Sequence, residues 1–193
     1  TNSEITTLTN TGTISGTAGN NTGDGIDGII LSASNITTLT NTGTISGTAG
    51  NDSGLGIDLV NSTITTLTND STISGEATNN IGNGIILFTN SEITNLTNND
   101  TISGTAGNDN ARGIILFTNS EITTLTNDGT ISGTAGTSSG RGISLRTNSK
   151  ITNLINNDTI SGTATGTSNG RGIALFTNSE ITTLTNTGTI SGT

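Results

Sequence analysis

The residues of this chain that could take part in chemistry are few and of limited kinds. Of its 193 residues, 14 are Asp or Glu and five are Lys or Arg, and the sequence has no His and no Cys. The chain therefore has no imidazole base, no thiolate nucleophile and no zinc or iron–sulfur site of the usual ligand kind. Carboxylates remain for acid–base work, and two of them facing each other across a cleft would suit the cleavage of a glycosidic bond.

Four glutamates occupy one position of a sequence repeat, directly before an Ile: Glu4, Glu92, Glu121 and Glu180. An active site is a local exception along a chain, whereas these residues form a regular row. We therefore expect a solvated acidic edge that discourages sideways aggregation, and we assign no catalytic residue and no enzyme activity. Lys150 takes the same position between Glu121 and Glu180, so we expect an exposed ion-pair ladder there. Cleavage of a polysaccharide stays open as an alternative.

Three arginines form a second row: Arg112, Arg141 and Arg171 each stand two residues before an Ile in consecutive repeats. Guanidinium groups spaced about one strand apart would suit a sulfated or carboxylated polymer, because each presents a fork of donors to an anionic group. This row is the candidate ligand face. The alternative is that the arginines pair with nearby carboxylates.

A third row contains the three aromatic residues of the chain and one arginine: Phe88, Phe117, Arg146 and Phe176. Aromatic side chains at one repeated position typically cover a corner of a repeat protein, and Arg146 between two rings would make a cation–π contact. The alternative is that the rings bind sugars.

The only candidate metal ligands are Asp24 and Asp27, in a Gly- and Asn-rich loop of the first repeat, which could hold calcium. The loop matches neither the twelve-residue EF-hand nor the G-G-x-G-x-D nonapeptide repeat, so calcium is a weak candidate and no other cofactor is expected. The net charge of −9 disfavours nucleic acids and anionic membranes as partners.

The positions of these rows follow from a repeat of 28 to 31 residues. The motif I-T-x-L recurs seven times, and residues 1–17 reappear letter for letter as residues 177–193. A fixed period of this length is typical of solenoids and propellers. We interpret residues 1–193 as one solenoid segment, expected to be an excerpt of a longer array. Its repeats start near Thr1, Ala33, Asn61, Asn90, Asn119, Asn148 and Asn178.

Each repeat contains three short apolar segments: I-T-x-L, then T-I-S-G, then G-I-x-L. From Leu8 to Ala18 the inward and outward residues alternate, and a period of two indicates a strand. Stacking each segment on its copies predicts an all-β fold, a right-handed parallel β-helix with three strands and about 29 residues per coil, and about six and a half coils. The core is expected to contain one Ile from each T-I-S-G segment: Ile14, Ile45, Ile73, Ile102, Ile131, Ile160 and Ile190.

One Asn recurs five residues after the first Ile of every repeat. We expect these amides to bond to one another from coil to coil, because a buried polar group without a partner costs about 1–3 kcal/mol. The residues that follow tolerate a left-handed backbone, so a tight bend is expected after each Asn. The predicted ladder consists of Asn10, Asn41, Asn69, Asn98, Asn127, Asn156 and Asn186.

Hydroxyl side chains form rows on the opposite side of the second segment. Thr13 and Ser15 recur in every copy, and Thr17 recurs in all but the third, where Glu76 replaces it. Such T-x-S-x-T arrays resemble the ice-binding faces of antifreeze solenoids. The alternative is that Thr is simply a favourable solvent-facing residue in strands.

The string T-N-T-G-T-I-S-G-T at residues 9–17, followed by G-I-x-L, resembles the passenger repeats of bacterial autotransporters and related large surface adhesins. The resemblance covers Ile5 to Ile190. It implies a right-handed β-helix, export across the outer membrane and an extracellular or cell-surface location. We therefore expect a non-enzymatic stalk, fibre or adhesin segment. Its expected partners are further copies stacked end to end and a host or matrix glycan, with membrane contact only through anchoring regions outside this sequence.

Overall fold

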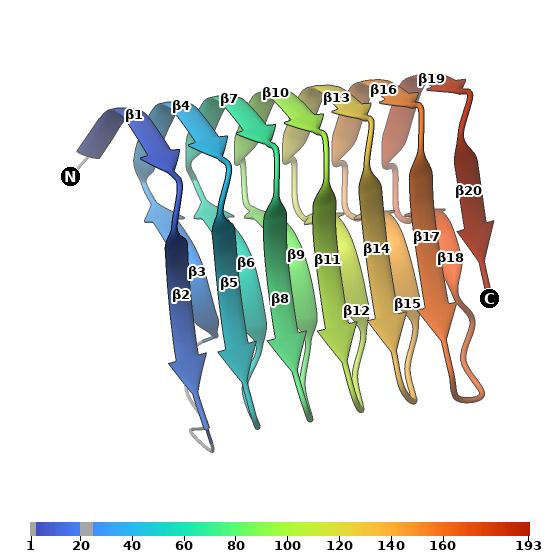
Figure 1. Ribbon diagram of the computed structural model, residues 1–193. Coiled ribbons are helices and arrows are strands. Elements are labelled where there is room, and N and C mark those ends of the chain that lie inside the picture. The colour runs from blue at the N-terminus through green and yellow to red at the C-terminus, as the bar shows by residue number, and fades with distance from the viewer. Residues whose placement is uncertain (1–2, 20–24) are drawn as a thin grey trace.

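The computed structural model describes residues 3–19 and 25–193. The described residues form twenty strands, and none of their segments is a helix long and apolar enough to span a membrane. The strands belong to three sheets, and every strand pair within them is parallel (Figure 1). The chain passes through the three sheets in turn and then begins the next coil.

The first sheet contains the I-T-x-L segments: β1 (Ser3–Asn10), β4 (Ser34–Asn41), β7 (Thr63–Asn69), β10 (Glu92–Asn98), β13 (Glu121–Asn127), β16 (Lys150–Asn156) and β19 (Glu180–Asn186). The second sheet contains the T-I-S-G segments: β2 (Thr13–Ala18), β5 (Thr44–Ala49), β8 (Thr72–Ala77), β11 (Thr101–Ala106), β14 (Thr130–Ala135), β17 (Thr159–Ala164) and β20 (Thr189–Gly192). The third sheet contains the G-I-x-L segments: β3 (Ile26–Ser32), β6 (Gly54–Val60), β9 (Gly82–Phe88), β12 (Ala111–Leu116), β15 (Gly140–Leu145) and β18 (Arg171–Leu175).

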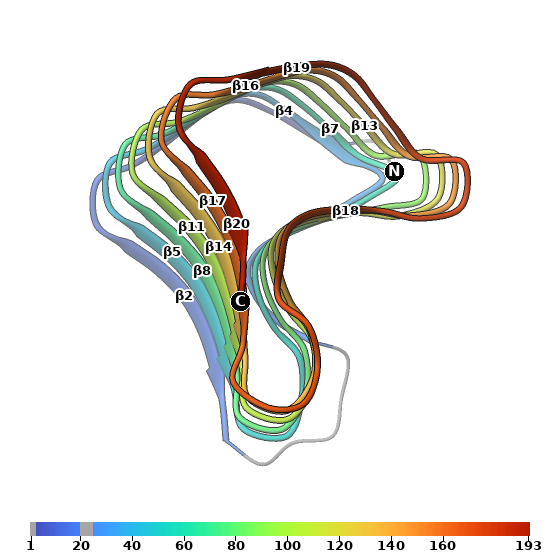
Figure 2. The ribbon, with the colours of Figure 1, turned by 90° about the vertical axis from the view of Figure 1, so that its right-hand side faces the viewer.

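The coil is right-handed. In Figure 2 the C-terminal end is nearest the viewer, and the chain runs anticlockwise from β18 through β19 to β20 as it advances toward the viewer. Pairing within each sheet aligns each repeat with the next, so that Ile93 stacks on Ile122 and Ile102 on Ile131. The predicted fold class, a right-handed parallel β-helix with three strands per coil, is confirmed.

The core is a tube of Ile and Leu side chains contributed by all three sheets. Ile45, Ile73, Ile102, Ile131 and Ile160 are completely buried. Ile14 and Ile190, in the outermost coils, are partly buried and pack against the same cluster. Each buried aliphatic side chain contributes about 1.5–3 kcal/mol, so stacking holds the fold together although the chain has only three aromatic residues.

The asparagine ladder is continuous from the first coil to the last. Each Nδ2 donates to the Oδ1 of the Asn in the next coil at 2.7–2.8 Å, from Asn10 through to Asn186. The Nδ2 of Asn98 also donates to the backbone carbonyl of Asp100, two residues ahead. This bond holds the bend after the Asn, and the residues there do not have positive φ angles. The expected left-handed bend after the Asn is therefore wrong.

The left-handed backbone occurs instead at the corner between the third and first sheets. Thr89 and Asn90 have φ angles of 41° and 57°, and the same pair recurs in the three following coils. A β-branched residue in this region is strained. The strain is offset by a buried serine row that the sequence analysis missed: Ser91 Oγ donates to the carbonyl of Phe88 at 2.6 Å and accepts from the backbone N–H of Ser62.

The second and third sheets meet backbone to backbone. Gly104 of β11 faces β12, and a Cβ atom at Gly104 would overlap the backbone oxygen of Arg112. The glycine of the T-I-S-G motif is therefore a packing residue, because only a residue without a side chain lets the two sheets approach this closely. The tube narrows where these sheets meet, and the third sheet then turns away, so that its outer face is concave (Figure 2).

Candidate ligand-binding groove

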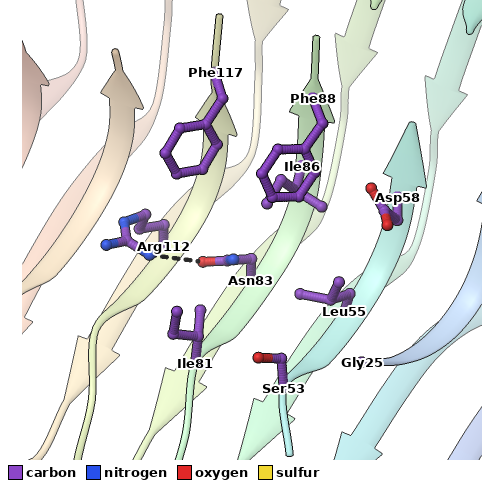
Figure 3. A pocket seen from close by; sticks show the side chains of 10 residues that line it. All are labelled: Gly25, Ser53, Leu55, Asp58, Ile81, Asn83, Ile86, Phe88, Arg112 and Phe117. Carbon is purple, nitrogen blue, oxygen red and sulfur yellow. Dashed lines mark hydrogen bonds between the residues drawn. The ribbon is translucent and has the colours of Figure 1, made fainter. Parts of the chain in front are cut away.

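The outer face of the third sheet contains a groove of about 280 Å³. It lies over β6, β9 and β12, between the loops that enter the third sheet and the corner that leaves it (Figure 3). The alternation within each strand places its residues. Ile85 and Leu87 of β9 point into the tube, so the intervening Ile86 and the following Phe88 face outward into the groove.

The strands of the third sheet are in register, so their outward residues form columns along the axis of the solenoid. One outward column runs through Asp58, Ile86, Ile115 and Ser144. A second column, before the Gly of the third segment, runs through Leu55, Asn83, Arg112, Arg141 and Arg171. Because the residue types change along these columns, the groove is acidic at the N-terminal side, apolar in the middle and basic at the C-terminal side.

The apolar part is a second hydrophobic cluster, separate from the tube. Leu55, Ile86 and Ile115 are buried, and Phe88 and Phe117 pack against them. The two rings are stacked, with centroids 4.9 Å apart and planes inclined by 8°. Two rings of the expected Phe row, those of Phe88 and Phe117, thus pack on the outer face of the third sheet, along one edge of the groove (Figure 3).

The basic part contains the predicted arginine row, but the three arginines lie in different environments. Arg171 is exposed, whereas Arg112 and Arg141 are only 4% and 6% exposed. The candidate ligand face therefore does not present three equally accessible guanidinium groups. Their Nη1 atoms donate to amide oxygens, of Asn83 at 3.5 Å and of Asn110 at 3.2 Å.

Arg112 is held among like charges. Burial, followed by the charges of Arg141 and Arg146, lowers the pKa of Arg112 to about 9, against the smaller opposite effect of Asp109. Burial, followed by the charges of Arg146 and Arg171, also lowers the pKa of Arg141. Among the described residues, neither Nε atom has a hydrogen-bond partner. In this cluster the charges of the arginines thus outweigh that of Asp109, and among the described residues the Nε–H groups of Arg112 and Arg141 lack acceptors.

Arg146 occupies the position between rings that the sequence predicts. Its guanidinium carbon lies 5.7 Å from the centroid of Phe117 and 4.9 Å from that of Phe176. Arg141 also approaches Phe176, at 5.5 Å. The predicted cation–π contact is therefore present on both sides of Arg146.

At the acidic side Asp58 lines the groove, and the charge of Asp27, from the preceding coil, acts on it. Burial, followed by the charge of Asp27, raises the pKa of Asp58 to about 7, and burial, followed by the charge of Asp52, raises the pKa of Asp27 to about 6. One carboxylate oxygen of each has no hydrogen-bond partner within the described part of the chain. Asp58 is a groove residue that was not expected from the sequence. The sequence does contain one indication of its special place: Asp58 stands at a repeat position that the next two repeats fill with Ile86 and Ile115.

The structure describes only one of the two residues of the calcium candidate. Asp27 lies in β3, in register with Leu55 of the groove lining, while Asp24 lies outside the described residues. Within residues 3–19 and 25–193, no three acidic side chains gather into a group that could hold a metal ion.

The acidic row on the first sheet is in register. Lys150 is aligned between Glu121 and Glu180. These carboxylates accept hydrogen bonds from hydroxyl groups instead, Glu121 from Thr152 at 2.9 Å and Glu180 from Thr182 at 3.0 Å. The alignment is as expected, but in the part of the chain that the structure describes these carboxylates bond to threonine hydroxyls rather than to Lys150.

No protein-family model, no curated protein and no solved structure matches this chain. We therefore infer a function from the geometry of the solenoid and of its groove.

Proposed function

We propose that this chain is a non-enzymatic structural segment of an extracellular stalk, fibre or surface adhesin, which extends as a stiff rod and presents a repeated polar surface. The observation that carries this proposal is the register of the coils. Equivalent residues stack in all three sheets, and a single asparagine ladder runs the length of the segment. The likeness of its repeats to those of autotransporter passengers supports the extracellular role.

Stacking gives such a rod its mechanical properties. Every strand between the outermost coils is paired on both sides, so neither face along the rod presents an open strand edge. Each coil adds about 4.8 Å of length, and six to seven coils give about 30 Å. Because each coil contacts only its neighbours, length can change by whole repeats without a change of fold. These are the properties that a spacer needs.

The experiment is to add one coil. Residues 90–118 form one repeat, and the residues that follow, Asn119-Ser120-Glu121, have the same letters as Asn90-Ser91-Glu92. A second copy inserted after Thr118 should lengthen the rod by about 4.8 Å in small-angle X-ray scattering and leave the melting temperature equal or higher. A matched control inserts the same 29 residues in scrambled order. If the repeat insertion leaves the length unchanged or unfolds the chain as the control does, this structural role is wrong.

Ice binding is a second candidate, favoured by the hydroxyl rows of the second sheet. The register aligns Thr44, Thr72 and Thr101 from coil to coil, and beside them Ser46, Ser74 and Ser103. The strands carrying them lie side by side in Figure 1. Adjacent rows lie about 7 Å apart along each strand, and successive hydroxyls within a row about 4.8 Å apart.

A measurement of thermal hysteresis tests this candidate. Ice binding predicts hysteresis in the unmodified chain and its loss when Thr101 is replaced by Tyr, with Thr97→Tyr on the first sheet as the control. Absence of hysteresis and of ice shaping in the unmodified chain would exclude it.

A further inference from the structure

The geometry points to a binding site for a small apolar carboxylate in the groove of the third sheet, with the carboxylate group on Arg112 and the alkyl or aryl body on the Leu55, Ile86, Phe88 and Phe117 cluster. This inference is independent of the structural role, because a rod needs no ligand.

Arg112 is the residue that selects the charge of the ligand. Its side chain is 4% exposed and lines the groove. The charges that act on it most strongly are those of Arg141 and Arg146, and its hydrogen bond to the Oδ1 of Asn83 is long at 3.5 Å. A buried guanidinium normally has an anionic or well-bonded partner, because leaving it without one is costly. A ligand carboxylate would supply both the charge and the acceptors that this cluster lacks.

The apolar lining of the groove determines the body of the ligand. The groove is lined by Leu55, Ile86 and two phenyl rings, a surface that is unfavourable in contact with water. Its volume of about 280 Å³ suits a small molecule rather than a polymer chain. The stacked rings of Phe88 and Phe117 cover each other's inner faces, so the groove offers little flat aromatic surface for a sugar. An apolar chain therefore fits this lining better than an acidic glycan does.

The charged residues on opposite sides of the groove determine the orientation of the ligand. Figure 3 shows Arg112 and Asp58 on opposite sides of the groove, with Asn83 and Ile86 between them. The two charged groups are separated by two coils, about 10 Å along the axis. Repulsion from Asp58 and attraction to Arg112 place an anionic headgroup at the arginine side. The body then extends over Ile86 and Phe88 toward Leu55.

The experiment is a titration of the ¹⁵N-labelled protein with octanoate, followed through the Nε–Hε signals of its four arginines. Saturable shifts of the Arg112 signal are expected, together with nuclear Overhauser contacts from the octanoate chain to the rings of Phe88 and Phe117. Octylammonium, which has the same chain and the opposite charge, should not bind. Acetate, which has the charge without the chain, should bind at least about tenfold more weakly. A uronate oligosaccharide tests the glycan alternative in the same way.

The matched variants are Arg112→Gln and Arg171→Gln, which each remove one arginine of the same row. Loss of Arg112 should weaken octanoate binding at least about tenfold, whereas loss of the exposed Arg171 should leave it unchanged. If Arg112→Gln does not fold, the ligand series and the contacts to the phenyl rings in the unmodified chain decide the question. Equal binding of octylammonium, tighter binding of the uronate, equal effects of the two variants or no saturable shift would each overturn the inference.

Discussion

Replacing Asp58 by Asn should stabilise the solenoid at pH 8 and stabilise it less at pH 5. Asn has the shape of Asp without the charge. The Asp58 side chain is 8% exposed, and one of its oxygens has no hydrogen-bond partner among the described residues. Burial and the neighbouring charge of Asp27 raise its pKa from 3.8 to about 7. Ionised Asp58 is therefore a destabilising group in the folded chain.

The sign and size of the effect follow from proton linkage. Between about pH 4 and pH 7 the folded chain binds the proton of Asp58 more tightly than the unfolded chain does, so the free energy of unfolding falls as the pH rises through this range. One pKa unit corresponds to about 1.4 kcal/mol, which sets an upper limit of about 4 kcal/mol for the interval from 3.8 to about 7. Water at the open side of the groove screens part of this, and we expect a gain of about 2 kcal/mol at pH 8.

The assay is urea unfolding at pH 5 and pH 8, followed by far-ultraviolet circular dichroism. Glu76→Gln is the control, because it removes one negative charge from an exposed position of the second sheet. Asp58→Asn should raise the free energy of unfolding at pH 8 and flatten its dependence on pH, and Glu76→Gln should do neither. The reasoning is refuted if Asp58→Asn fails to stabilise the chain at pH 8, or if both variants give the same gain.

Two further substitutions test the packing of the coils, each against a control at another residue of the same type. Gly104→Ala should destabilise the fold by about 3 kcal/mol, since the added Cβ meets the backbone of β12. The control Gly12→Ala, where an added Cβ has no atom within 4 Å, should change the stability by less than about 0.5 kcal/mol. Equal melting temperatures of the two variants would contradict the close contact of the two sheets. Asn98→Ala should destabilise the fold by about 3 kcal/mol because it removes the ladder hydrogen bonds to both neighbouring coils. The control Asn99→Ala, at an exposed residue, should have a small effect. Similar losses of stability in the two variants would show that the ladder adds little.

The features that the sequence predicts well are those that depend on the repeat alone. Ile102 and Asn98 recur at fixed distances in every copy, and a residue that recurs so regularly in a solenoid stacks on itself. Their burial and the amide ladder follow from that stacking. The cation–π position of Arg146 was predictable for the same reason, because its row contains Phe in the neighbouring coils.

The features that the sequence does not reveal depend on the shape of the cross-section. The concave outer face of the third sheet results from its backbone contact with the second sheet at glycines such as Gly104. Period-two alternation shows which residues face outward, but not that an outward face is hollow. Arg112 and Asp58 therefore look like ordinary surface residues in the sequence and prove to be buried. The left-handed corner at Thr89 was missed because Thr is rarely found in that conformation.

The most direct test of the stacked-coil account is a pair of distances between spin labels. The chain has no Cys, so labels can be attached at single introduced cysteines. Thr42, Asp70 and Thr187 each follow a ladder Asn and are exposed. Double electron–electron resonance should give about 24 Å for Thr42→Cys with Thr187→Cys, five coils apart, and about 19 Å for Asp70→Cys with Thr187→Cys, four coils apart. A broad distribution near roughly 60 Å, as expected for an unfolded chain, or equal distances for the two pairs would contradict the account.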